Sequence, residues 1–486
     1  MSSKKACIVA DLRTGEHLTK IPDIVAVLAA AGWKTKVALK EYGGETIQLA
    51  QKATEKRFDL VIGYGGDGTL NAVLNGVVYA GGKSLAADIP GGTFNVWAGT
   101  IGVPNDPVKA ALALVGSEPR MIDLGHVEVT GLTSAEKQVE EEKDQKKAKR
   151  STKNRQYFLL NVGMGVDAKM MNHISKPLKY RTGPFAFDIA TIKELPNQRP
   201  YPVEIQQTNA AGDIENSWQG EVWQVYISKV PLFGGSMQIE TEARADDGLL
   251  YICLITANGP VKTMEQVISF FTQHKPEKGT TKYFRGKHFS IKIPASVDMH
   301  IDGSISKLED LLHAADQKLL EETTDKAQLM VNYQFDIKEK ALSIAIPQTY
   351  DGRLFVKPAH KENGQAEIQQ QPKERDKGGE QAGEQTEQKS AELQQKEQYK
   401  ITVIGAVRQE GKQPAIIVAG NLKKLNTDET QVVALRVAEE TSVLDKEGTN
   451  VPAAVALEWK EGQELLIEGS KSKRGVIKAS WIKIVE

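Results

Sequence analysis

The sequence predicts an α/β N-terminal domain, an antiparallel β-sandwich domain, a disordered linker and a small C-terminal β-barrel. Short apolar runs of strand length alternate with helical stretches as far as residue 125, and such runs follow one another with fewer helices from residue 126. A polar stretch then separates the last group of runs from the rest. At 486 residues the chain has room for about three domains.

The first domain, residues 1–125, is expected to contain a mostly parallel sheet. Its helical stretches include residues 21–31 and 45–55, and they lie between strand-like runs at residues 6–10, 36–39, 60–62 and 85–88. Strands that alternate with helices in this way are typical of parallel sheets covered by helices.

The second domain, residues 126–350, is expected to be β-rich. Strand-like runs occur at residues 157–161, 222–228, 249–255 and 289–293. Residues 134–156 form a charged insertion, expected as a solvated loop or frayed helix, with a membrane or partner contact as the alternative. Residues 307–322 form a helical insertion with leucines at near-helical spacing, which either packs on the protein or serves as a lipid-facing lid.

The C-terminal third combines a linker with a separate domain. Residues 351–398 are rich in Gln, Glu, Lys and Gly, and so few large apolar side chains cannot offset the entropy of ordering the chain. Residues 399–486 contain repeated strand-like runs with turn residues between them, which predicts a small β-barrel, OB-like in size, with a partner of its own.

Composition limits the possible partners and compartments. A formal net charge of −1 gives no reason to expect nucleic acid binding at the first two domains. The cysteines, Cys7 and Cys253, both lie in apolar runs, which favours buried free thiols and a cytoplasmic setting. The apolar run near the N-terminus is too short for a signal peptide, and no run approaches the roughly 20 residues that cross a bilayer.

A first glycine turn, residues 65–69, carries the strongest functional signal. Gly65-Gly66-Asp67-Gly68-Thr69 follows the apolar run 60–62 and precedes the helical stretch 70–80. Glycines let backbone N–H groups approach an anion closely, the helix offers its positive N-terminus, and Asp67 could polarise a hydroxyl or help to hold Mg²⁺. The pattern therefore suggests phosphoryl transfer, although a tight turn needed only for steric reasons uses the same residues.

A second glycine turn, residues 90–95, repeats this design. Pro90-Gly91-Gly92-Thr93-Phe94-Asn95 offers Thr93 and Asn95 as side-chain donors and again opens an apolar stretch. Two phosphate-type turns so close together indicate a single nucleotide site.

These turns and several later blocks resemble the diacylglycerol kinase catalytic-domain family, which includes bacterial lipid kinases and sphingosine kinases. The GGDGT turn is shared with NAD kinases, whereas the later blocks in this order are more specific. The series covers roughly residues 5 to 347, and after the two turns its blocks are residues 101–104, 122–125, 161–168, 245–250 and 301–303.

The resemblance implies an N-terminal fold like that of NAD kinases and diacylglycerol kinases, with ATP and Mg²⁺ as cofactors. It implies that residues 1–125 bind the nucleotide and that residues 126–350 bind the lipid or another substrate. It also implies catalytic roles for Asp67 and Asp302. The implied nucleotide-binding residues are Gly65, Gly66, Gly68, Thr69, Asn71, Thr93 and Asn95.

Two further blocks have both a functional and a structural interpretation. Asp167 matches the aspartate that recognises the polar head of the lipid in sphingosine kinases, but it also suits a charge at a helix N-terminus. Asp247, with the carbonyl of Leu249, matches a structural Mg²⁺ site of bacterial lipid kinases, but Asp247-Gly248 is also a common turn signal.

Residue 304 departs from the family pattern. Family members usually have Asp-Gly-Glu where this chain has Asp302-Gly303-Ser304, and a neutral hydroxyl cannot accept a proton as a carboxylate does. Either Asp302 with Asp67 suffices, or activity is weakened, or the acceptor differs.

The leading hypothesis is an ATP-dependent, Mg²⁺-requiring kinase that phosphorylates a lipid hydroxyl, such as that of diacylglycerol or a sphingoid base, at the membrane surface. An NAD kinase-like enzyme would instead use a soluble dinucleotide. A third hypothesis is a catalytically weak nucleotide- or lipid-binding protein tethered through its C-terminal barrel. A homodimer is compatible with all three.

Overall fold

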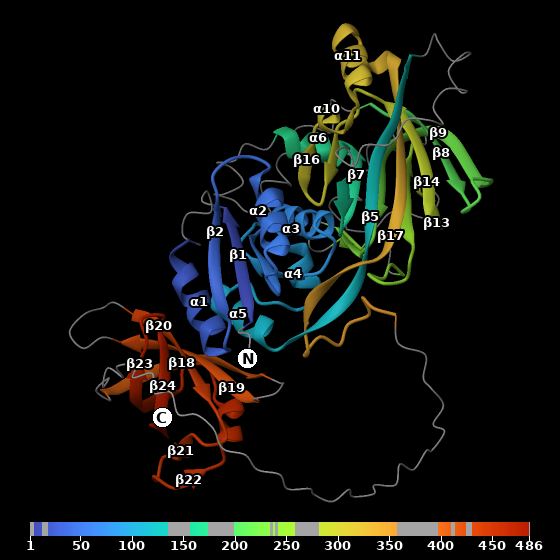
Figure 1. Cartoon of the computed structure of the whole chain (residues 1–486). Coiled ribbons are helices and arrows are strands. Elements are labelled where there is room, and N and C mark those ends of the chain that lie inside the picture. The colour runs from blue at the N-terminus through green and yellow to red at the C-terminus, as the bar shows by residue number, and fades with distance from the viewer. Residues whose placement is uncertain are drawn as a thin grey trace, which may run out of the picture.

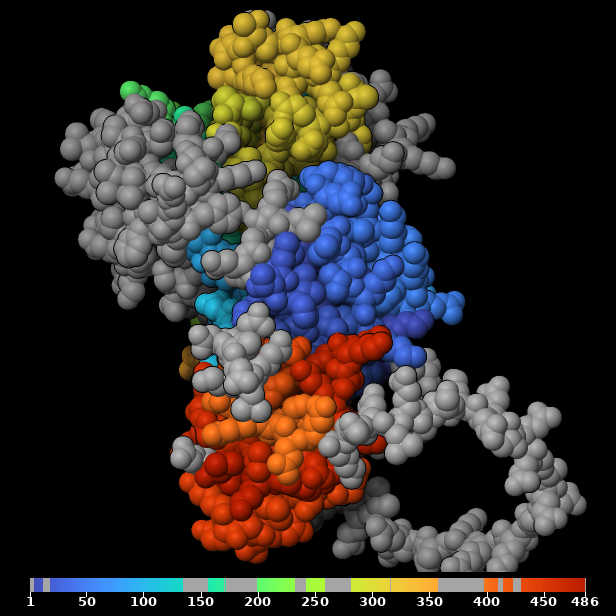
Figure 2. Space-filling view, turned by 90° about the vertical axis from the view of Figure 1, so that its left-hand side faces the viewer, coloured from blue at the N-terminus to red at the C-terminus, as the bar shows by residue number. Residues whose placement is uncertain are grey.

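The computed structural model arranges the chain as three packed parts in a row, with the α/β domain between the β-sandwich and the barrel (Figures 1 and 2). The structure describes residues 4–11, 18–134, 156–173, 199–233, 237–238, 242–257, 281–356, 397–409, 414–423 and 430–485.

The first domain is built on a parallel sheet whose strand order is β2 (Lys34–Lys40), β1 (Lys5–Asp11), β3 (Leu60–Gly65) and β4 (Leu85–Pro90). Each strand is followed by a helical segment, as the alternation of runs predicts. One face of the sheet is covered by α1 (Ile21–Ala30) and α5 (Pro107–Val115), and the other by α2 (Glu45–Glu55) and α3 (Asp67–Tyr79). A short helix, α4 (Val96–Thr100), follows the second glycine turn.

Two long strands connect this domain to the β-sandwich. They are β5 (Ser117–Ser134) and β17 (Leu329–Pro347), which pair antiparallel along most of their length. The amino-terminal half of β17 pairs with the sandwich strand β14 (His288–Pro294), while Ile344 near its other end bridges to Ala86 of β4. The two domains therefore share one continuous sheet (Figure 1).

The sandwich strands enclose a core of apolar side chains that includes Phe158, Phe289 and Phe335. The strands are β6 (Gln156–Phe158), β7 (Asn161–Gly165), β8 (Tyr201–Thr208), β9 (Ile214–Ser228), β12 (Leu250–Thr256), β13 (Thr281–Gly286), β14 (His288–Pro294), β15 (Met299–Ile301) and β16 (Ser304–Ser306), with α6 (Val166–His173) after β7 and a small hairpin of β10 (Leu232–Phe233) and β11 (Met237–Gln238). All the pairings among β7, β8, β9, β12, β13, β14 and β15 that the structure describes are antiparallel, as expected.

The helical insertion packs on the protein. It forms α10 (Leu308–Leu311) and α11 (Ala314–Glu322), followed by the short helix η4 (Lys326–Gln328). Leu311, Leu312 and Leu320 are buried in the sandwich core, so the leucine spacing reflects packing rather than a free lid. The charged insertion lies almost wholly outside the described residues, at 135–155.

The predicted linker lies mainly outside the described residues, at 357–396, but its first residues belong to the folded part. Leu354 is buried against the α/β core, and the N–H of Val356 donates to Asp246. The ordered chain therefore extends beyond the expected boundary at residue 350.

The C-terminal residues form the predicted small barrel. Five strands close it in the order β18 (Glu397–Gln409), β19 (Ala415–Lys423), β20 (Thr430–Val437), β24 (Val476–Ile484) and β23 (Glu464–Lys471), with β23 pairing back to β18. A short pair, β21 (Ser442–Leu444) and β22 (Asn450–Val451), and the helix η5 (Ala453–Glu458) lie between β20 and β23. OB-folds are also five-stranded barrels.

The barrel is docked on the α/β domain through α1 and α5 (Figure 2). Ile417, Ala419 and Ala434 on β19 and β20 join the same apolar cluster as Val27 and Leu28 of α1. At the edge, Gln409 donates to the carbonyl of Ala31, and Lys109 forms an ion pair with Glu461. The barrel is thus an integral part of the folded molecule.

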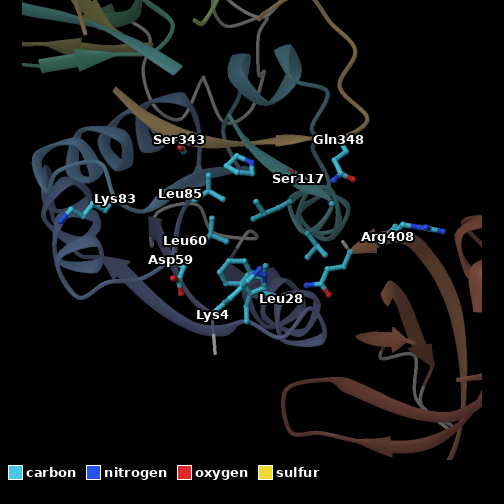
Figure 3. Close-up of a pocket in the computed structure, with 16 residues that line it drawn as sticks. Lys4, Leu28, Asp59, Leu60, Lys83, Leu85, Ser117, Ser343, Gln348 and Arg408 are labelled. Atoms are coloured by element: carbon cyan, nitrogen blue, oxygen red, sulfur yellow. The ribbon is translucent and has the colours of Figure 1, made fainter. Parts of the chain in front are cut away.

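A cavity of about 430 Å³ lies beside this contact (Figure 3). Its lining includes Leu60 and Leu85, which begin β3 and β4, together with Arg408 of the barrel. The glycine turns follow the opposite, carboxyl ends of the same strands, so this cavity is separate from the candidate site.

One expectation from composition is met. Cys7 and Cys253 are buried and free, and burial raises the pKa of the Cys7 thiol to about 11. Among the helices that the structure describes, none is long and apolar enough to cross a membrane.

Candidate functional site

The two glycine turns lie against each other where β3 and β4 end. Gly65 pairs with Pro90 in the sheet, and the N–H of Gly91 donates to the carbonyl of Gly65 at 2.7 Å. A Cβ atom on Gly92 would collide with the Cα of Gly66. Glycine is therefore required for this close approach, and the structure brings the two turns together as the sequence predicts.

Asp67 joins the two turns. It is the first residue of α3, and its carboxylate accepts the N–H groups of Val96 and Trp97, each at 3.1 Å, at the start of α4. These two bonds orient the Asp67 carboxylate and tie the first turn of α3 to the start of α4. The side chain is half-buried and faces the region between the turns.

The N-terminus of α3 is suited to an anion. Its N-cap is Gly66, and within the described chain no side chain caps this helix end. The partial positive charge and the N–H groups of a 13-residue helix therefore point out from the first turn. Gly68, Thr69 and Thr93 are half-buried around this point, where phosphate oxygens could be bound.

Asn95 stabilises the conformation of the second turn. Its amide group both donates to the carbonyl of Gly92 and accepts the N–H of Gly92, and its φ of 49° lies in the left-handed region that asparagine tolerates. A further bond runs from its Nδ2 to Asn105. Asn95 therefore holds the turn, and its side chain is already engaged with the protein.

Asp302 links the two domains. Its carboxylate accepts hydrogen bonds from the Asn71 side chain at 2.8 Å and from the N–H groups of Leu159, Leu160 and Asn161 at 2.8–3.0 Å. Asn71 lies on α3, whereas Asp302 immediately follows the sandwich strand β15 and is only 1% exposed. Asn71, predicted to bind nucleotide, contacts Asp302 in this structure.

This environment differs from that expected of a catalytic base. Burial raises the pKa of Asp302 to about 6, although the four hydrogen bonds favour the charged form and oppose this shift. All the lone-pair sites of a carboxylate are used when four donors surround it. Asp302 therefore positions its surroundings, and it does not present a free oxygen to an acceptor.

Ser304 lies at the point where the sandwich meets the first glycine turn. It begins β16, is exposed, and its Oγ is so near Gly68 that a Cβ atom there would collide with it. The residue that replaces the family glutamate therefore faces the N-terminus of α3.

Asp88 belongs to the same region and is not identified by the sequence patterns. It lies in β4 beside Gly63, is 8% exposed, and within the described chain its Oδ1 has no hydrogen-bond partner. Burial and the nearby charge of Asp67 raise the pKa of Asp88 well above its usual range. The feature of the sequence that could have identified Asp88 is its position, inside an apolar strand and two residues before the second turn.

Asp167 lies inside the sandwich. It is fully buried, and its Oδ2 is 2.7 Å from Nε2 of the equally buried His300, while Gln224 donates to its Oδ1 at 2.6 Å. A Cβ atom on Gly163 would collide with both members of this pair. The predicted headgroup ligand is therefore engaged within the protein, and the pairing with His300 could not be read from the sequence.

The oxygens of the predicted metal site surround a lysine. Nζ of Lys229 lies 2.5 Å from Asp247 Oδ1, 3.1 Å from the carbonyl oxygen of Leu249 and 2.6 Å from that of Arg244. The side chain of Lys229 is fully buried. Asp247 and Leu249 thus come together as expected, but their oxygens bind an ammonium group and do not fit a metal ion.

Two family models match the chain. Residues 7–127 match the diacylglycerol kinase catalytic domain, and residues 161–309 match the YegS C-terminal NAD kinase beta sandwich-like domain. These ranges contain both glycine turns, Asp167, Lys229 with its oxygen partners, and Ser304, whereas neither range reaches the barrel.

Curated relatives and solved structures agree with these matches. The chain is 25% identical over 255 residues to the diacylglycerol kinase of Bacillus subtilis (strain 168), covering 52% of this chain and 74% of that one. It is 24% identical over 301 residues to the diacylglycerol kinase of Staphylococcus epidermidis (strain ATCC 12228 / FDA PCI 1200), covering 62% and 84%. A crystal structure of a diacylglycerol kinase-family protein from Bacillus anthracis str. Sterne has a similar fold, with a TM-score of 0.51, 18% identity and coverage of 72% of this chain and 97% of that one.

Proposed function

We propose, from the match of residues 7–127 to the diacylglycerol kinase catalytic domain and of residues 161–309 to the YegS C-terminal domain, that the chain transfers the γ-phosphate of ATP to a lipid hydroxyl. The observation that carries this proposal is the convergence of both glycine turns, Asp67 and Ser304 at one point. The names of the relatives support diacylglycerol as the acceptor. A sphingoid base is the alternative acceptor that the sequence resemblance implies. A cytoplasmic protein in peripheral contact with the membrane is part of the same proposal.

In this proposal the chain contributes mainly positioning and charge. The N-terminus of α3 and the backbone of both turns bind phosphate oxygens, because N–H groups and the helix dipole favour anions. Asp67, oriented by the start of α4, accepts the proton of the attacking hydroxyl or holds Mg²⁺. Bound Mg²⁺ would neutralise charge that develops on the phosphate oxygens.

Asp302 and Asn71 keep the second domain in register with the first. Their hydrogen bond connects α3 to the β15–β16 hairpin, so the acceptor side of the site is held against the first glycine turn. Correct placement of two reactants can lower the activation free energy of a reaction by several kcal/mol. The hydrogen bond between Asn71 and Asp302 therefore contributes to the reaction without contact with the substrate.

A second candidate function rests on Ser304. The exposed hydroxyl lies where the family has a carboxylate, so the chain would bind nucleotide and lipid but transfer phosphate slowly. The two candidates share the binding site and differ only in turnover.

The test is transfer of labelled phosphate from [γ-³²P]ATP, with Mg²⁺, to vesicles or micelles containing diacylglycerol, a sphingoid base or another lipid alcohol, and to NAD in solution. A labelled lipid supports the proposal and identifies the acceptor class. Labelled NAD would assign an NAD kinase-like activity, and ATP binding without transfer to any acceptor would favour the second candidate.

A further inference from the structure

Lys229 occupies an unusual place for a lysine. It follows β9 at the junction of the two main domains, and its side chain is 0% exposed. Burying a charged ammonium is costly unless partners replace its water. The partners of Lys229 are therefore the feature that makes this position possible.

The surrounding oxygens match the three protons of an ammonium. Nζ donates to Asp247 Oδ1 at 2.5 Å, to the Arg244 carbonyl at 2.6 Å and to the Leu249 carbonyl at 3.1 Å. A second carboxylate, Asp123, has its Oδ2 at 3.3 Å from Nζ. We call these five residues the Lys229 cluster.

The carboxylates of the cluster are fully used by the protein. Asp247 Oδ1 also accepts the N–H of Leu249, and its Oδ2 accepts the N–H of Arg244 and the hydroxyl of Tyr251. Asp123 accepts the N–H groups of Gly248 and Lys340, one on each oxygen. A Mg²⁺ ion needs oxygens at about 2.1 Å in octahedral geometry, and the position central to these oxygens already holds Nζ.

We propose that the ammonium group of Lys229 is a built-in substitute for a divalent metal ion, so that the junction of the two domains is held without metal. The cluster draws together four segments that are distant in sequence: the end of β9, the turn 244–249, the bend of β5 at Asp123, and the bend of β17 at Lys340. This inference does not depend on the proposed kinase function.

The cluster is also connected to the candidate site. The N–H of Lys229 donates to the carbonyl of Leu160 at 2.9 Å, and the N–H of Leu160 donates to Asp302 at 2.9 Å. Lys229 is thus a positioning residue for the segment that binds Asp302.

Thermal unfolding without nucleotide tests the proposal in variants of the full chain. Lys229→Ala removes the ammonium and leaves space among the oxygens, so its midpoint should fall by about 10 °C in EDTA and recover partly in millimolar Mg²⁺ or Ca²⁺. The unfolding midpoint of Lys229→Met should fall by a similar amount and should not recover in either ion, because the methionine side chain fills the space among the oxygens. The double variant Lys229→Ala with Asp247→Asn should likewise show no recovery of its unfolding midpoint in Mg²⁺ or Ca²⁺.

The controls are the unchanged protein and Lys287→Ala, which removes a half-exposed lysine paired with Glu339. Both should unfold at the same temperature in EDTA as in Mg²⁺ or Ca²⁺. The proposal is overturned if Lys229→Ala is as stable as the unchanged protein, or if it gains nothing from either ion.

Binding of Mn²⁺ gives a second readout that does not require the alanine variant to fold. Without nucleotide, electron paramagnetic resonance should show the same amount of bound Mn²⁺ for the unchanged protein and for Asp247→Asn. A bound ion lost in Asp247→Asn would show that the cluster is a metal site and would contradict the proposal. Neither readout measures phosphate transfer, so failure here is distinct from failure of the kinase assignment.

Discussion

Ser304 supplies a hydroxyl where the related kinases have a carboxylate, and its contact with Gly68 places it at the N-terminus of α3. Ser304→Glu would place a second carboxylate near Asp67, able to accept the proton of the acceptor or to bind Mg²⁺. We expect the rate of phosphate transfer to rise by about tenfold or more, within the range that a positioned general base contributes.

The matched control for this change is Ser306→Glu, at the other end of the same strand. It adds the same charge to β16 and should leave the rate within about twofold. Equal rates for Ser304→Glu and the unchanged protein would mean that the missing carboxylate does not limit turnover.

Asp88 gives the stability of the first domain a predictable pH dependence. Its pKa is higher in the folded than in the unfolded protein, so its stabilising contribution is present at low pH and is lost as the pH rises through the folded value. Asp88→Asn is neutral at every pH. The variant should therefore gain stability relative to the unchanged protein between pH 5 and pH 8, measured by urea unfolding.

The exposed Asp351→Asn serves as the control and should show no such gain. A difference in unfolding free energy between Asp88→Asn and the unchanged protein that is the same at pH 5 and pH 8 would contradict the assignment.

At the level of single residues, the sequence predicts a site residue only where the elements that position it are adjacent in the chain. Gly65 to Thr69 and Asp67 can be recognised because the strand, turn and helix that position them are contiguous. The roles of Asp302 and Asp167 depend on donors from segments far away in the chain, such as Asn71 and His300. Burial and pairing of this kind cannot be inferred from a motif.

Among the elements, the β15–β16 hairpin depends on Asp302 for its attachment to α3 and to residues 159–161. Asp302→Ala leaves four donors without an acceptor, and each buried, unsatisfied group costs about 1–3 kcal/mol. We expect the free energy of unfolding to fall by about 3 kcal/mol or more in urea titrations, together with a loss of activity.

Asp310→Ala is the control, because Asp310 is exposed on the neighbouring helix α10. It should change the free energy of unfolding by less than about 0.5 kcal/mol. A similarly small effect of Asp302→Ala would show that the hairpin is held by other contacts.

The sequence predicts elements well where periodicity decides them. The alternating runs of the first domain and the leucine spacing of residues 308–320 both correspond to observed elements. The Lys229 cluster had no comparable signal, since a lysine after an apolar strand is ordinarily a surface residue. Its partners come from separate turns and strands that only the tertiary fold brings together.

At the scale of the whole molecule, the sequence does not predict where the barrel packs on the rest of the protein. The strands β19 and β20 could be recognised, but their contact with α1 requires small side chains such as Ala419 and Ala434 that carry no distinctive pattern. The barrel's first partner is therefore the kinase-like domain of its own chain.

Ala419→Glu should release the barrel, because it buries a carboxylate in the contact with α1. The barrel should then separate from α1, and the radius of gyration measured by small-angle X-ray scattering should increase. Ala454→Glu, at an exposed position of the same barrel, should leave the radius unchanged. An unchanged radius for Ala419→Glu would mean that the contact does not hold the barrel.

The most direct measurement compares phosphate transfer from ATP to a lipid acceptor in Asp67→Asn and Asp106→Asn. Both aspartates accept two N–H groups at the start of a helix, Asp67 at α4 and Asp106 at α5, so both variants lose a similar cap. The proposed mechanism predicts that Asp67→Asn lowers the rate by about 100-fold or more while Asp106→Asn stays near the unchanged protein. Equal rates for the two variants would contradict a reaction centred on Asp67.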